Sequence, residues 1–135
     1  FGGPFLTLHP LRYAKLLKEK IEKHGSKVYL VNTGWIGGSP ASGASRISIS
    51  NTRNIITSIL DGSIEKTNFV QENYFGFLIP EKLNNVETKI LNPQQMWSDK
   101  NQYQEVAKKL SDMFKENFKQ YGSEVDYLQK YGPQI

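Results

Sequence analysis

The stretch VYLVNTGWIGGSPASGASRISISNTR, residues 28–53, decides the fold that we expect for this chain. It holds an apolar run that ends at Trp35, a loop of Gly, Ser, Ala and Pro over residues 36–45, and a short run that leads into a capped helix. In α/β proteins, a strand followed by a Gly-rich loop commonly borders a ligand pocket. The same composition is equally typical of a mobile surface loop. The stretch therefore predicts a candidate ligand loop, and both interpretations stay open at this point.

A helix and a buried strand are predicted before the loop. Pro10 is favoured at a first helical position, apolar residues then recur at helical spacing, and Gly25 can end a helix over residues 10–24. Residues 27–31 form a continuous apolar and β-branched run, which is typical of a strand covered on both faces. A helix that leads into a buried strand is half of a βαβ unit, so the sequence predicts the α/β class.

A short strand and a second helix are predicted after the loop. Ile47 and Ile49 alternate with serine residues, which is the pattern of a short strand. Asn51 or Thr52 can cap the following helix, and the Asp-Gly pair at residues 61–62 can end it. Thr52 would then lie at a helix N-terminus beside the loop, where free N–H groups favour electron-rich ligand atoms. Capping alone would also explain both candidate residues.

The remainder of the chain predicts one β-rich stretch and two helices. Residues 68–80 are rich in β-branched and aromatic residues and stop at a proline, and we expect their rings in the core. Ser98 or Asp99 can cap the longest helix, which carries one apolar stripe, and residues 124–131 predict a last short helix. Because no repeat and no linker divides the sequence, we expect residues 1–135 to form a single unit.

Composition narrows the functional classes. The net charge of +4 comes from 17 Lys and Arg against 13 acidic residues, and the lysines are spread along the chain, as on a solvated surface. Nucleic-acid binders more often cluster their basic residues. No run is long enough to span a membrane, no signal-peptide pattern is present, and the absence of Cys fits a reducing compartment. We therefore expect a soluble, cytoplasmic protein without nucleic-acid or membrane partners, cut at Phe1 from a larger protein.

The search for catalytic motifs is mainly negative. His9 and His24 are far apart and lack metal-ligand spacing, and no Ser lies in a nucleophile-elbow pattern. The Gly-rich loop does not match a phosphate loop, because residues 37–46 contain no Gly-Lys-Ser or Gly-Lys-Thr ending. The residues alone therefore predict an α/β piece with a candidate ligand loop and no catalytic or metal-binding residue.

Four blocks of the sequence resemble, in matching order, the C-terminal part of the ATP-dependent phosphoenolpyruvate carboxykinases. They are FGGPFLTLHPLRYAKLL, YLVNTGWIGG, RISISNTRNIITSILDGS and FGFLIPEKLNNVETKILNP. The resemblance implies the C-terminal part of a mononucleotide-binding domain with a mixed sheet. It also implies a lyase of gluconeogenesis that converts oxaloacetate and ATP to phosphoenolpyruvate, CO2 and ADP, with Mg2+ and Mn2+ as helpers. GTP-using relatives resemble the chain poorly.

By this resemblance, Arg46, Ile47 and Thr52 match positions that hold the adenine side of ATP. Elementary chemistry agrees, since a guanidinium can lie on a purine face, a backbone can hydrogen-bond the base edge, and a hydroxyl can bond a ring nitrogen. The loop departs from the family pattern between Gly38 and Arg46. Family members often carry Pro-Tyr-Gly-Val-Gly there, whereas SPASGAS is slightly longer and lacks the aromatic residue, so the loop conformation stays open.

The resemblance places the remaining functional parts upstream of Phe1. These are the phosphate loop, the metal-binding Lys, His and Asp, and the oxaloacetate-binding Arg, so the chain is expected to need the remainder of the same polypeptide and to be inactive alone. An alternative from another class is a non-catalytic nucleotide- or single-strand-nucleic-acid-binding module. Such a module would use Tyr74, Phe75 and Phe77 with scattered lysines.

Overall fold

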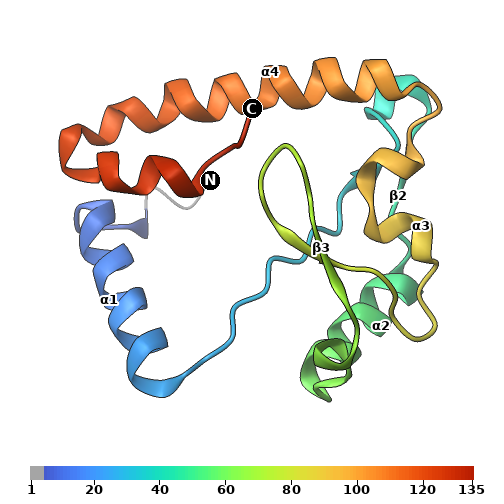
Figure 1. Cartoon of the computed structure of the whole chain (residues 1–135), viewed down its shortest axis with the longest axis horizontal. Helices are drawn as coiled ribbons and strands as arrows, with labels where there is room; N and C mark the ends of the chain where they lie inside the picture. The colour runs from blue at the N-terminus through green and yellow to red at the C-terminus, as the bar shows by residue number, and fades with distance from the viewer. Residues whose placement is uncertain (1–4) are drawn as a thin grey trace. The chain divides into compact units, whose positions relative to one another are not determined.

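The computed structural model describes residues 5–135, which Figure 1 draws as a coloured ribbon. The chain divides into two compact units. One unit ends at Asn32 and the other comprises Thr33–Ile135. The boundary falls directly after the apolar run of the first unit, where the sequence pattern carries no linker signal. That both units belong to one nucleotide-binding domain stays a prediction, and each unit is described by itself.

The first unit is built on helix α1, Pro10–His24. The Nδ1 atom of His9 accepts the N–H of Leu11 at 3.3 Å, and Gly25 adopts the left-handed conformation with φ 60° at the C-terminal end. The predicted start and end are therefore confirmed. None of the helix residues is buried, so the apolar stripe of α1 finds no cover within its own unit.

The strand that we predicted over residues 27–31 is wrong. The segment has no regular secondary structure, and the side chains of Val28 and Leu30 are 62% and 79% exposed. A strand exists only where its backbone pairs with another strand, and a continuous apolar run requires cover on both faces. The described residues of this unit supply neither.

The second unit contains two small antiparallel sheets and no mixed sheet among the described residues. The expected combination of helices and strands is confirmed, whereas the mixed sheet is wrong for residues 5–135. Parallel strands need crossover connections of about a dozen or more residues, and here each pair is joined by a short return of the chain. The strands are β1 (Trp35–Ile36) paired with β2 (Ser45–Arg46), and β3 (Phe69–Gln71) paired with β4 (Leu78–Pro80).

Helix α2, Ile49–Leu60, follows directly after β2. The hydroxyl of Ser48 caps it by accepting the N–H of Asn51 at 3.1 Å. The predicted caps, Asn51 or Thr52, are therefore wrong by one turn. The strand that we predicted through Ile47 and Ile49 is also wrong. Strand β2 ends at Arg46, and α2, capped by Ser48, already begins at Ile49. The predicted end at residues 61–62 is confirmed.

The aromatic stretch over residues 68–80 forms a hairpin rather than one strand. The carboxylate of Glu72 accepts the N–H groups of Tyr74 and Phe75 at 2.9 and 2.7 Å, which turns the chain between β3 and β4. Tyr74 and Phe75 are half-buried, but Phe77 is 55% exposed. The expectation that these rings lie in the core is therefore confirmed only in part.

Helix α4, Lys100–Phe118, is the longest helix. One carboxylate oxygen of Asp99 accepts the N–H groups of Asn101 and Gln102 at 2.8 and 3.2 Å, which confirms the predicted cap. The predicted last short helix is present as η6 (Ser123–Tyr131), which has 3-10 geometry. The remaining helical segments are α3 (Thr88–Leu91) and the 3-10 turns η2 (Pro40–Ser42), η3 (Ser63–Lys66), η4 (Pro93–Met96) and η5 (Lys119–Tyr121).

Tyr103 is the centre of the aromatic packing on α4. Its ring meets Tyr74 at 5.4 Å and Trp97 at 5.7 Å between centroids, both edge-on. Burial raises the pKa of Tyr103 to about 12, with a further contribution from Glu72. The buried apolar side chains of the described residues are Ile64, Leu83, Val86, Tyr103, Ala107 and Val125.

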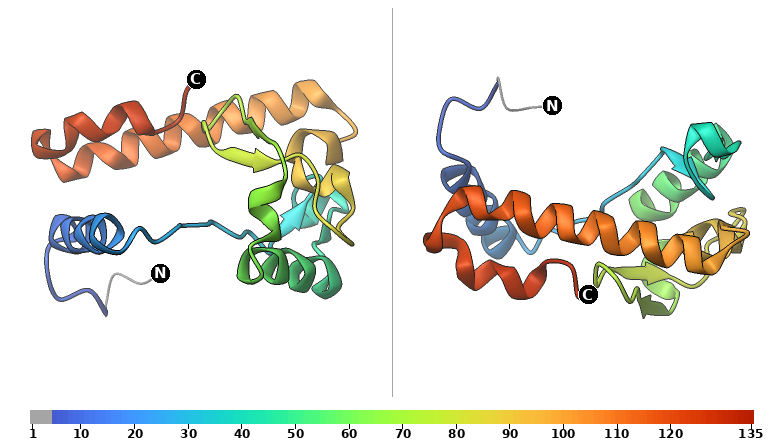
Figure 2. Two further views of the ribbon diagram at one scale, coloured as in Figure 1. Left: turned by 60° about the horizontal axis from the view of Figure 1, so that its bottom comes forward. Right: turned by 90° about the horizontal axis from the view of Figure 1, so that it is seen from above.

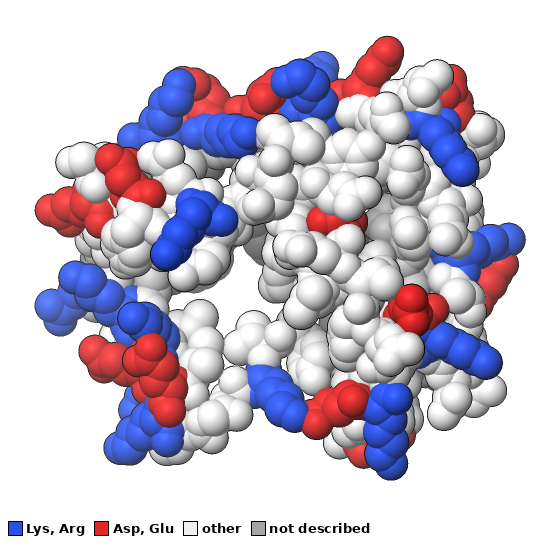
Figure 3. Space-filling view, in the orientation of Figure 1, with Lys and Arg blue, Asp and Glu red and all other residues white. Residues whose placement is uncertain are grey.

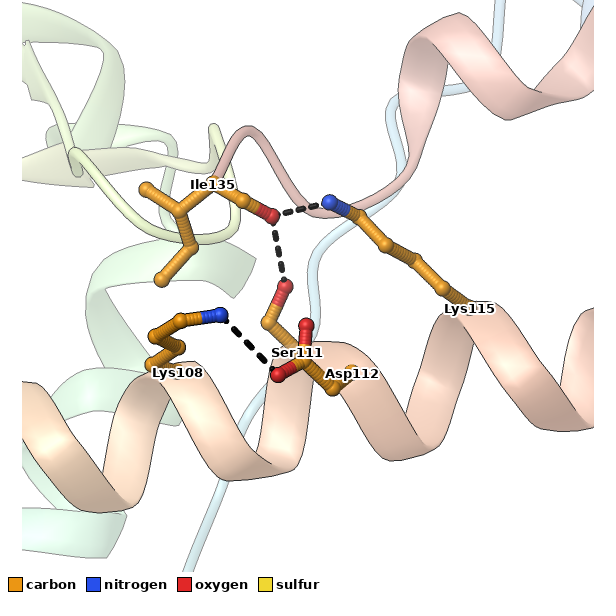
Figure 4. A network of polar contacts seen from close by, with 5 residues as sticks. All are labelled: Lys108, Ser111, Asp112, Lys115 and Ile135. Carbon is orange, nitrogen blue, oxygen red and sulfur yellow. Dashed lines mark hydrogen bonds and ion pairs between the residues drawn. The ribbon is translucent and has the colours of Figure 1, made fainter.

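The last residues of the chain lie along α4 (Figure 4). The carbonyl oxygen of Ile135 accepts hydrogen bonds from the hydroxyl of Ser111, at 3.1 Å, and from the ammonium of Lys115. The N–H of Gln134 donates to the carbonyl of Tyr74 at 2.7 Å. The tail therefore joins α4 to the turn of the β3–β4 hairpin.

Candidate nucleotide-binding site

The candidate ligand loop is the connection of the β1–β2 ribbon. In this ribbon Trp35 lies opposite Arg46, and Ile36 lies opposite Ser45. The N–H of Ile47 donates to the carbonyl of Gly34 at 3.1 Å, which extends the pairing beyond the two strands. In both views of Figure 2 the short cyan strands lie next to the green helix α2, which follows them in the chain. The loop is thus held at both ends.

The loop has its own internal structure. The hydroxyl of Ser42 donates to the carbonyl of Ser39 at 2.8 Å, and the N–H of Ala44 donates to the same carbonyl at 3.3 Å. Gly37 has φ +80°, and a Cβ atom there would lie 2.7 Å from the carbonyl oxygen of Met96. The first part of the loop therefore runs against the backbone of η4, and only glycine permits this approach.

Arg46, Ile47 and Thr52 all lie at the junction of β2 and α2. Arg46 is the last residue of β2 and is exposed, whereas Ile47 and Thr52 are half-buried. Thr52 lies in the first turns of α2, where its N–H donates to the carbonyl of Ser48 at 3.0 Å. The structure thus brings the three predicted residues into one continuous segment beside the loop.

The environment of Arg46 and Thr52 removes two purely structural explanations. Among the described residues, the guanidinium of Arg46 takes part in no ion pair. In this part of the chain, no carboxylate therefore pairs with Arg46 to tie the loop in place. Since Ser48 caps α2, the hydroxyl of Thr52 is not required as the cap.

The backbone of Ile47 offers one hydrogen-bonding group rather than two. Its N–H is already used by the carbonyl of Gly34, so only its own carbonyl oxygen can meet a ligand. A carbonyl oxygen accepts but cannot donate. Within residues 5–135, the junction therefore combines a cation without an ion pair, a backbone acceptor and a hydroxyl, which is a donor and acceptor set that suits the edge and face of an amino-substituted purine.

Sequence reasoning missed the helix cap beside the site and the position of Trp35 opposite Arg46. The cap of α2 is Ser48. The available signal was that serine is a favoured N-cap residue and that Ser48 directly precedes the helix-forming segment. The sequence predicts Trp35 at the mouth of the loop, as a reporter of nucleotide binding, but its place opposite Arg46 depends on the register of the β1–β2 pair. No local pattern in the sequence specifies that register.

The rings required by the nucleic-acid alternative are partly engaged elsewhere. Tyr74 packs edge-on against Tyr103, and Phe75 packs against Phe114 with centroids 6.3 Å apart. Figure 3 shows, on the face that it draws, basic side chains interspersed with acidic ones. A nucleic-acid binder typically gathers basic residues in a patch or stripe, so neither feature favours this alternative.

Residues 5–135 contain no group of three or more His, Cys, Asp or Glu side chains that could hold a metal ion. In the same part of the chain, no helix has the length and apolar character needed to cross a membrane.

The comparisons with known proteins agree with the resemblance read from the sequence. The family model described as phosphoenolpyruvate carboxykinase matches residues 1–89, a range that includes Arg46, Ile47 and Thr52. The chain therefore belongs to the phosphoenolpyruvate carboxykinase family.

Its curated relatives are named phosphoenolpyruvate carboxykinase (ATP). The protein of Campylobacter jejuni serotype O:23/36 is 51% identical over 137 residues, covering 100% of this chain and 26% of that protein. The protein of Sulfurimonas denitrificans is 49% identical over 138 residues, with 100% and 26% covered. That of Caldanaerobacter subterraneus is 43% identical over 133 residues, with 98% and 25% covered. The chain thus spans about a quarter of the length of these relatives.

Proposed function

We propose that this chain supplies the adenine side of the ATP site of an ATP-dependent phosphoenolpyruvate carboxykinase, as the C-terminal part of its nucleotide-binding domain. The complete enzyme would convert oxaloacetate and ATP to phosphoenolpyruvate, CO2 and ADP in gluconeogenesis, in the cytoplasm. The observation that carries the proposal is the exposed Arg46 guanidinium, without an ion pair in residues 5–135, beside Ile47 and Thr52. Membership of the family supports it.

Each residue has a distinct role in the proposed site. The guanidinium of Arg46 lies against the purine face, where the cation meets the electron-rich ring. The carbonyl of Ile47 accepts a hydrogen bond from the amino group of adenine, while the hydroxyl of Thr52 bonds a ring nitrogen. Guanine presents a carbonyl oxygen where adenine presents that amino group, so the Ile47 carbonyl disfavours guanine. The site thereby selects ATP over GTP.

The remainder of the same polypeptide would supply the other parts of the active site. By family resemblance these are the phosphate loop, the oxaloacetate-binding Arg and the ligands of Mg2+ and Mn2+. When bound, the metal ions neutralise charge on the transferred phosphoryl group. Residues 5–135 contain no cluster of metal-ligating side chains, so the contribution of this chain is to bind and orient the base.

Replacement of Arg46 by Lys in the complete carboxykinase tests the proposal. Lysine keeps the charge but lacks the planar face, so the loss should be about 1–2 kcal/mol, equivalent to a five- to thirty-fold higher KM for ATP. The KM for oxaloacetate should hardly change, because the base is remote from the reacting carbon. Arg12→Lys, at an exposed position of α1, is the control. A normal KM for ATP together with a lowered melting temperature would assign Arg46 to the scaffold.

A further inference from the structure

Trp35 is a large side chain beside the proposed adenine site to which the proposed function gives no role. It is 49% exposed, although exposure of so large an apolar ring is unfavourable. The other tryptophan, Trp97, packs against Tyr103. Among the described residues, Trp35 takes part in no ring pair and no cation–π contact. Both faces of its indole therefore lack an aromatic or cationic partner in this part of the chain.

The register of the ribbon places Trp35 next to Arg46. Their Cα atoms are partners in the β1–β2 pair. Directly opposite residues of an antiparallel pair project from the same face of the sheet, with Cβ atoms about 4.5–5.5 Å apart. Ile36 and Ser45, the other pair, project from the opposite face. A flat aromatic ring and a flat cation thus leave the ribbon side by side, one residue before the carbonyl of Ile47.

We propose that Trp35 is a further binding residue for the nucleotide, and that its indole stacks on the same purine base that Arg46 contacts. This inference rests on the proposed function and adds a residue to that site. Stacking between an aromatic side chain and a base uses the ring faces and tolerates any base. Trp35 therefore adds affinity for purine nucleotides in general, whereas the edge contacts at Ile47 select adenine.

The test measures equilibrium binding of ATP and of GTP to the complete carboxykinase. Trp35→Ala should weaken ATP about ten-fold, which lies within the range found when single base-stacking rings are removed. GTP should weaken by the same factor, so that the preference for ATP stays constant. Trp35→Phe keeps a stacking ring and should restore most of the affinity. The KM for oxaloacetate and the melting temperature without nucleotide should stay close to those of the unaltered enzyme.

Arg46→Lys, measured alongside, separates failure of this inference from failure of the proposed site. If Arg46→Lys weakens ATP and Trp35→Ala does not, the role of Trp35 is refuted and the adenine site stands. If neither change weakens ATP, both are refuted. If Trp35→Ala lowers the melting temperature and Trp35→Phe fails to restore ATP affinity, Trp35 is a scaffold residue and the inference is overturned.

Discussion

At the scale of single residues, the hydroxyl groups of Ser48 and Thr52 differ in role. That of Ser48 caps α2, whereas that of Thr52 is not used for capping. The hydroxyl of Ser48 accepts the N–H of Asn51 and so satisfies a free donor at the start of α2. Thr52 is half-buried and does not form the cap. Its hydroxyl is therefore available for a ligand, and substitutions at the two positions should have different consequences.

We predict that Ser48→Ala lowers stability and that Thr52→Val lowers ATP affinity. Removal of a serine cap costs about 0.5–2 kcal/mol, which should appear as a lower melting temperature of the complete enzyme without nucleotide. Valine has the shape of threonine without the hydroxyl, so Thr52→Val should cost about 0.5–1.5 kcal/mol of ATP binding, equivalent to a two- to twelve-fold higher Kd. Thermal melts and ATP titrations of both variants decide the matter. The opposite assignment of the two effects would refute the roles given to Ser48 and Thr52.

At the scale of elements, the β1–β2 ribbon is positioned by a close backbone approach. The loop runs against η4 at Gly37, where even a methyl group would lie 2.7 Å from the carbonyl oxygen of Met96. A backbone oxygen cannot move aside as a flexible side chain can. The placement of the ribbon, and of Arg46 on it, therefore depends on this contact.

We predict that Gly37→Ala is more harmful than Gly43→Ala. Both glycines have φ +80°, so both substitutions carry a similar backbone penalty of about 1–2 kcal/mol. Gly43 has nothing within 4 Å of the added methyl group, whereas at Gly37 the ribbon must shift away from η4. Gly37→Ala should therefore show both the lower melting temperature and the higher KM for ATP in the complete enzyme. Equal values for the two variants would show that the approach to η4 does not position the site.

Sequence reasoning succeeded for α1 and α4 because their signals are local. His9 and Pro10 start α1, Gly25 ends it, and Asp99 caps α4, each through contacts within a few residues. It failed for the segment over residues 27–31, because a strand needs a distant partner that no local pattern reveals. The pairing of β1 with β2 was missed for the same reason.

The residues of the candidate site were predicted from the family resemblance and not from local sequence patterns. Arg46, Ile47 and Thr52 were identified by family resemblance, and their chemistry alone would not have singled them out. The place of Trp35 depends on the register of two strands of only two residues each, which no alternation of apolar residues could specify. The occupied N–H of Ile47 likewise depends on that pairing.

At the scale of the whole molecule, the chain exposes more surface than a folded protein of its mass. Its accessible surface is 10450 Å², whereas a compact protein of 15.4 kDa exposes about 7,200 Å². Even two separate folded units of these lengths would expose only about 8,400 Å² together. The excess includes apolar side chains of α4, such as Met113 at 59% and Phe114 at 53% exposure.

Part of this exposed apolar surface forms a groove in the second unit. The groove has a volume of about 480 Å³ and lies between the tip of the β3–β4 hairpin, the second half of α4 and η6. Its aromatic lining residues are Phe75, Phe77, Phe114, Phe118 and Tyr131. Such a surface is unfavourable in water, and patches of this kind mark interaction sites or aggregation liabilities.

We therefore predict that the isolated chain is at best marginally stable and has no carboxykinase activity. Chemical denaturation should give a broad transition at low denaturant, and a dye that binds exposed apolar surface should fluoresce strongly before unfolding. The complete enzyme is the reference for both measurements. Formation of phosphoenolpyruvate from oxaloacetate and ATP by the purified 135-residue chain would contradict the prediction.

Photoaffinity labelling with an azido-adenine analogue of ATP would locate the base within the enzyme, because the reactive group is carried by the base itself. The complete carboxykinase is labelled, digested, and the modified peptide is identified by mass spectrometry, with excess ATP as the competitor. We expect a label within residues 35–52 that excess ATP abolishes. A competed label that lies entirely outside residues 1–135 would contradict the claim that this chain holds the adenine side of the site.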